Sequence, residues 1–246
     1  NTAVGANALD ANTTASDNTA MGFHALGANT TGTQNTAVGT YAMYDCTTGL
    51  YNTAVGESAL ADVVSGERNT AVGRRAAFKN TGSQNTAMGY NSFYENTTGQ
   101  YCTAIGSRAL LNNTTADNNT AVGTDSGMNI TTGASNTAVG SYALDADTTG
   151  SNNIAIGNNA GGAITTGNDN VVMGTNALAS LTTNHDNVAI GRRSLENSTA
   201  SNNTAVGFDS LRANTTGQRN TAVGGAALDA NTTGSYIVAV GFNALG

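Results

Sequence analysis

The chain carries few side chains that could bind a metal or act as a nucleophile. His24 and His185 are its only histidines, and Cys46 and Cys102 are its only cysteines. A metal site needs several such ligands to converge on one ion, and a disulfide needs two cysteines whose Cα atoms lie within about 7 Å. Whether any of these side chains can meet depends on how the chain between them folds.

The carboxylates are equally dispersed. A glycosidase needs two of them about 5 to 10 Å apart, and the acidic residues here follow no pattern of pairs. They include Asp10, Asp17, Asp62, Asp125, Asp147 and Asp209. No phosphate-binding loop, nucleophile elbow or HExxH zinc motif is present. We expect a protein that is not an enzyme and that needs no cofactor or metal.

Composition narrows the partners further. The net charge is −7, and only nine basic residues are available to meet phosphates, which argues against nucleic-acid binding. No run approaches the roughly 20 apolar residues of a membrane span, so we expect no membrane insertion within this segment. The chain begins at Asn1 without an initiator methionine, and we expect it to be a fragment of a longer protein.

One short pattern recurs through all 246 residues. The pentamer NTAVG, or a close relative, begins every 17 residues, and twice after only 16. It begins at residues 1, 18, 35, 52, 69, 85, 102, 119, 136, 153, 170, 187, 203, 220 and 237. A typical repeat reads NTAVGxxALxxNTTGxx, and the repeat positions below are counted from its first Asn. We therefore expect one repeat domain over residues 1–246.

Several repeat positions are restricted to one kind of residue. Position 5 is always Gly, position 4 is always Val, Ile or Met, and position 2 is always β-branched. Position 3 is Ala except at Val172, position 8 is only Ala or Ser, and position 9 is mostly Leu. Short β-branched segments that stop at Gly are typical of strands, whereas the Gly, Asn and Thr content opposes helix.

The pattern predicts an all-β fold, a parallel β-solenoid of about fifteen coils of 17 residues. Positions 1 to 4 form one strand per coil and positions 8 to 11 a weaker second strand. The NTTG block turns the chain, with positive φ at its final Gly or at Asn184. Coils spaced about 4.8 Å apart would form a rod on the order of 70 Å long. The two histidines then cannot meet, and four coils, roughly 19 Å, separate Cys46 from Cys102.

Each repeat offers little apolar bulk, because positions 3 and 8 hold small residues. A file of small residues indicates a close approach of backbones, either across a thin coil or against a neighbouring chain. We therefore favour an oligomer with a shared axis over a monomer.

The segments NNIAIGNNA (152–160) and DNVAIGRRSL (186–195), together with the NTTG turns, resemble head repeats of trimeric autotransporter adhesins. They are even more similar to 17-residue repeats of phage tail-fibre proteins. The resemblance covers the whole chain and implies a trimer of left-handed β-rolls on the outside of a cell or virion. Adhesin heads use fourteen or fifteen residues per coil, and no stalk, anchor or C-terminal chaperone is recognisable here.

The resemblance also implies that the position-4 side chains lie in the hydrophobic interior as a structural core ladder. They are Val4, Met21, Val38, Val55, Val72, Met88, Ile105, Val122, Val139, Ile156, Met173, Ile190, Val206, Val223 and Val240.

The resemblance favours a structural function, that of a rigid extracellular fibre or adhesin segment that displays or spaces receptor-binding regions. Its partners would be other copies of the chain, with a host-surface glycan or protein left open. The candidate surface contacts lie at the variable positions 6 and 7, where neutral variation is the alternative explanation. They are Arg74, Arg75, Arg192, Arg193, Phe23 and Phe208.

Two other functions stay open. The first is a self-assembling extracellular filament in which chains stack end to end. The second is ice binding, which the repeated threonines suggest. Adjacent threonines such as Thr30 and Thr31 would point to opposite sides of a strand, which argues against ice binding.

Overall fold

The computed structural model describes residues 1–246 and contains strands and turns only. The chain comprises two compact units, the N-terminal unit Asn1–Asn119 and the C-terminal unit Thr120–Gly246. The strands of the N-terminal unit are β1 (Thr2–Val4), β2 (Thr19–Met21), β3 (Thr36–Val38), β4 (Thr53–Val55), β5 (Thr70–Val72), β6 (Thr86–Met88) and β7 (Thr103–Ile105). Those of the C-terminal unit are β8 (Thr120–Val122), β9 (Thr137–Val139), β10 (Ile154–Ile156), β11 (Val171–Met173), β12 (Val188–Ile190), β13 (Thr204–Val206), β14 (Thr221–Val223) and β15 (Val238–Val240).

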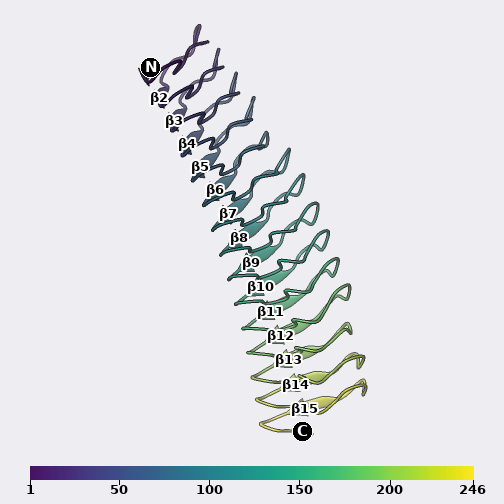
Figure 1. The fold of residues 1–246 in the computed structure, drawn as a ribbon. Coiled ribbons are helices and arrows are strands. Elements are labelled where there is room, and N and C mark those ends of the chain that lie inside the picture. Colours follow the sequence, from purple (N-terminus) through teal and green to yellow (C-terminus); the bar gives the residue numbers. More distant parts are fainter. The chain divides into compact units, whose positions relative to one another are not determined.

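Within each unit the strands pair in chain order, all parallel, so that each repeat forms one coil of a β-solenoid (Figure 1). Equivalent repeat positions face one another, as in Thr53↔Thr70 and Val55↔Val72. The predicted parallel β-solenoid with coils of 17 residues is therefore confirmed. A single domain over residues 1–246 stays a prediction.

The invariant glycine at position 5 ends each strand for two reasons. Gly56 has a φ of +135°, a conformation that side chains with a Cβ rarely adopt. A Cβ on Gly56 would also lie 2.5 Å from the carbonyl oxygen of Gly73 in the next coil. The close stacking of coils thus excludes any other residue at this position.

The turns differ from the prediction in two ways. Positive φ occurs at positions 7, 9 and 17, for example at Ser58, Leu60 and Arg68. The NTTG glycines and Asn184 do not have it. Gly49 is instead required by space, because its Cβ would lie 2.7 Å from the carbonyl oxygen of Gly66.

The predicted second strand at positions 8 to 11 is wrong, because these residues form turns. A left-handed residue at position 9 breaks the extended conformation that a strand needs. The turns still bond to the next coil, as in Leu60 N–H to Ala76 O at 3.0 Å and Asp62 N–H to Phe78 O at 3.0 Å.

Apolar side chains fill the interior of each coil, with small ones at positions 3 and 8 and larger ones at positions 9 and 12. In the fourth repeat, Ala54, Ala59, Leu60 and Val63 are fully buried. They occupy positions 3, 8, 9 and 12. The file of small residues therefore reflects a thin coil whose opposite walls lie close together.

The position-4 residues do not line this interior. A three-residue strand turns alternate side chains to opposite faces, so the buried Ala at position 3 forces position 4 outward. Val4, Met21 and Met88 are 55%, 46% and 41% exposed. The expected core ladder Val4, Met21, Val38, Val55, Val72, Met88, Ile105, Val122, Val139, Ile156, Met173, Ile190, Val206, Val223 and Val240 is half-buried or exposed on the single chain.

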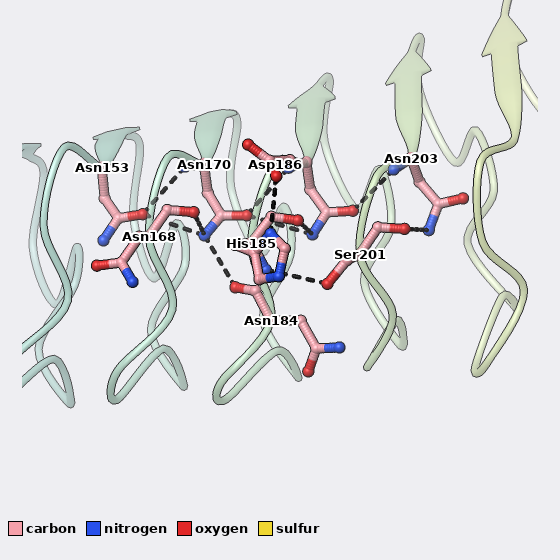
Figure 2. A network of polar contacts seen from close by, with 9 residues as sticks. Asn153, Asn168, Asn170, Asn184, His185, Asp186, Ser201 and Asn203 are labelled. Atoms are coloured by element: carbon pink, nitrogen blue, oxygen red, sulfur yellow. Dashed lines mark hydrogen bonds and ion pairs between the residues drawn. The ribbon is translucent and has the colours of Figure 1, made fainter.

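The asparagine at position 1 links neighbouring coils from inside. The Oδ1 of Asn170 accepts the backbone N–H of Asn187 at 3.1 Å, and Asn187 Oδ1 accepts that of Asn203 at 3.0 Å (Figure 2). The Asn203 amide in turn donates to Gly217 O at 2.9 Å. The asparagines therefore form a ladder along the coils, and most of its bonds join a side chain to the backbone.

Candidate functional site

The most regular exposed feature of the chain is the outward surface of its strands. We call the side chains at positions 2 and 4 of the repeats the outer strand face. In β4 these are Thr53 and Val55, while Ala54 between them points into the coil. In-register pairing repeats this arrangement from strand to strand within each unit.

The outer strand face is uncharged, and it places a row of apolar side chains at position 4 beside mostly threonine at position 2. None of the fifteen repeats has a charged residue at positions 1 to 5. Its position-4 side chains remain accessible in the middle of both units, with Val55 38% and Met173 39% exposed. At position 2, Ile154 is 39% exposed. Soluble monomers rarely expose long contiguous apolar patches, which mark interaction surfaces.

The predicted contact residues at positions 6 and 7 are largely engaged with neighbouring coils. Arg193 donates to both carboxylate oxygens of Asp209, at 2.8 and 2.6 Å. Arg192 lies over the ring of Phe208, 4.8 Å from its centroid. These bonds and ring contacts reduce what Arg192 and Arg193 can offer a ligand.

The other arginine pair behaves similarly. Arg74 forms a 3.1 Å ion pair with Glu57 and lies 5.8 Å from the ring centroid of Tyr90. The Glu57 carboxylate raises the pKa of Arg74 through its hydrogen bond and charge. Arg75 lies over the ring of Phe78. These arginine contacts could have been predicted from the sequence, because each partner residue lies about one repeat away or a few residues along the same repeat.

Phe23 is the predicted residue whose surroundings are the most unusual. Its ring is 42% exposed and contacts His24 and Tyr41 edge to face, at centroid distances of 4.2 and 5.4 Å. The sequence predicted Phe23 as a candidate surface contact but did not predict its ring neighbours. The structure brings them together with Tyr41 and Tyr44 from the next coil.

The second histidine and the cysteines have local partners only. His185 Nδ1 lies 2.7 Å from Asp186 Oδ2, and its backbone N–H donates to Ser201 Oγ (Figure 2). Cys46 and Cys102 are both buried free thiols. Burial raises the pKa of each thiol to about 11.

Neither unit contains a helix of membrane-spanning length and hydrophobicity. Comparison with protein-family profiles, with curated proteins and with solved structures finds no match. The residues themselves must therefore support any functional assignment.

Proposed function

We propose that this chain is a structural segment of an extracellular fibre or adhesin, and that it assembles with other copies through the outer strand face into a trimer. The observation that carries the proposal is the uninterrupted row of apolar side chains at position 4 of that face. Position 4 is Val, Ile or Met in all fifteen repeats although it points outward. If position 4 were only exposed to solvent, polar residues would be expected in at least some of the repeats.

Packing against a second copy would bury these side chains. Burial of apolar surface contributes about 25 cal/mol per Å², and the face recurs on every coil, so the contribution grows with each repeat. Charged residues are depleted at the centres of protein interfaces, which agrees with their absence from positions 1 to 5. The resemblance to trimeric adhesin heads and tail-fibre repeats favours three copies around one axis.

The mechanical part of the function follows from the bonding between coils. Each coil donates backbone hydrogen bonds to its neighbour, for example Gly56 N–H to Val38 O and Thr53 N–H to Asn69 O, both at 2.8 Å. Buried asparagines add a side-chain bond at most steps, such as Asn52 N–H to Asn35 Oδ1 at 2.9 Å. In a repeat protein such nearest-neighbour bonds supply the stability. A stack bonded this way suits a spacer that carries binding regions away from a surface.

A matched pair of substitutions tests the interface. Val55 lies on the outer strand face and is 38% exposed, whereas Val64 in the same repeat is 47% exposed on another side of the coil. Val55→Lys should shift the assembly toward single chains in sedimentation experiments, and Val64→Lys should not. Unchanged assembly in Val55→Lys and in the triple variant Met21→Lys/Val55→Lys/Met88→Lys would refute the proposed interface.

Ice binding is a second candidate, because the structure removes one argument against it. The adjacent threonines of the turns are not the relevant array, since Thr30 Oγ1 donates to Thr47 O at 3.1 Å. The threonines of position 2 point outward instead, beside the apolar residues of position 4. This gives each unit a regular face of hydroxyl and methyl groups. Thermal hysteresis of a chain that is monomeric in solution would favour ice binding over assembly.

A further inference from the structure

The N-terminal aromatic cluster consists of Phe23, His24, Tyr41 and Tyr44, from two neighbouring coils. The rings of His24 and Tyr41 are stacked, with an interplanar angle of 7° and centroids 5.5 Å apart. Tyr44 meets both of these rings edge-on, again at 5.5 Å. The chain has only thirteen Phe and Tyr residues, so three of them in one cluster with a histidine is a marked local concentration.

The cluster is exposed and held in place. Phe23, Tyr41 and Tyr44 are 42%, 39% and 37% exposed. A Cβ on Gly27 would lie 3.3 Å from two carbon atoms of the Tyr44 ring, so this glycine lets the ring pack against the backbone. Rings fixed by one another and by the backbone lose little conformational entropy when a ligand binds.

The charged residues near the cluster indicate which ligand charge it can accept. Residues 1–51, which form the first three repeats, contain no Lys or Arg, and the first such residue is Arg68. Asp10, Asp17 and Asp45 are the charged residues of this stretch. An anionic ligand, such as a sulfated glycan or a phosphate, would find no lysine or arginine here.

The cluster combines apolar ring surface with hydrogen-bonding groups at its edges. The two tyrosine hydroxyls and the His24 imidazole supply donors and acceptors, and the Asn7 side-chain amide lies 3.1 Å from His24 Nε2. Aromatic surface with a few polar groups is typical of ligand sites that bind a partly apolar, partly polar molecule. The C–H face of a sugar ring and its hydroxyl groups match this combination.

We infer that the N-terminal aromatic cluster is a binding site for neutral oligosaccharide. The inference deepens the proposed function, because it names a ligand class for an adhesive segment. Assembly is measured as mass and this site as ligand binding, so either proposal can fail while the other stands.

The test is calorimetric titration of the purified chain with cellohexaose, whose glucose rings present flat C–H faces, and with a heparin hexasaccharide as the anionic probe. We expect saturable binding of cellohexaose, with roughly tenfold weaker affinity in Phe23→Ala and in Tyr41→Ala. Tyr41→Phe, which keeps the ring, should retain most of the affinity. The matched control is Tyr142→Ala, because Tyr142 occupies the same repeat position and is 46% exposed.

Three results would overturn the inference. They are the absence of saturable cellohexaose binding by the unaltered chain, an equal loss in Tyr142→Ala, and tighter binding of heparin than of cellohexaose. Circular dichroism of each variant shows whether the solenoid is intact, and Tyr41→Phe keeps the test valid if Tyr41→Ala fails to fold.

Discussion

Asp147 Oδ1 accepts a 2.8 Å hydrogen bond from the backbone N–H of Gly150 inside the coil, while Oδ2 of the same carboxyl has no partner. Asp147 is fully buried, and the equivalent position holds Ile130 in the coil before it and Ile164 in the coil after it. This apolar environment disfavours the carboxylate, and burial raises the pKa of Asp147 to about 7.

The raised pKa predicts that acid stabilises the C-terminal unit. Between the unfolded pKa near 3.8 and the folded value near 7, the folded state binds more protons, so stability falls as pH rises through this window. Above pH 7 the free energy of unfolding is lower by the full amount, about 2 to 4 kcal/mol. Asp147→Asn places at this position the residue found in many other repeats, and it should remove most of this pH dependence.

Urea unfolding of both proteins between pH 4 and pH 8 measures the effect. Burial also raises the pKa of Asp62 and Asp145, so the difference between the two proteins, rather than either curve alone, reports Asp147. Parallel stability curves would contradict the assignment.

Gly56→Ala should destabilise the N-terminal unit by about 2 to 5 kcal/mol. The methyl group would meet the Gly73 carbonyl at 2.5 Å, and the backbone φ of +135° would be strained. The control is Thr53→Val, because valine occupies position 2 at Val171 and Val188. Thermal unfolding should show a large decrease for the first variant and almost none for the second. Similar melting temperatures would show that the coils can separate at little cost.

Asp209→Ala should cost about 2 kcal/mol of stability, because it leaves Arg193 without its two charge-assisted hydrogen bonds. The Asp209 side chain is only 9% exposed, and Arg212 lies 3.4 Å from it as a second cation. Glu57→Ala removes the exposed pair with Arg74 and should cost less than about 1 kcal/mol. Chemical denaturation compares the two, and an equal effect would mean that burial does not strengthen the Asp209 pair.

Cys46 and Cys102 should be almost inert toward thiol reagents in the folded chain. With a pKa of about 11, roughly one thiol in a thousand is ionised at pH 8, and burial restricts access further. A colorimetric thiol assay should show little reaction in buffer and two reactive thiols per chain in denaturant. Rapid reaction in buffer would indicate that the coils around these residues open.

The repeat made the coil predictable, because a residue type that recurs every 17 positions implies that equivalent residues stack on one another in neighbouring coils. The pairs Thr53↔Thr70 and Val55↔Val72 confirm this. The orientation of the strand was harder to predict. Hydrophobicity alone would bury Val55, but the alternation of side chains along the strand turns Ala54 inward and Val55 outward.

The positive φ at position 9 also could not be predicted from the sequence. Leucine rarely adopts positive φ, yet Leu60 does so at 50° because burial of its side chain and the bond to Ala76 outweigh the local preference. The aromatic cluster could have been found in part. Phe23 and Tyr41 stand about one repeat apart at neighbouring positions, and stacking of coils brings such residues together.

The proposed function depends most on whether other copies cover the outer strand face, and the solution mass of the unaltered chain tests this directly. Light scattering across a range of concentrations should give one species near three times the 24.6 kDa of a single chain. A uniform mass of 24.6 kDa at every concentration would contradict assembly through Val55 and its counterparts.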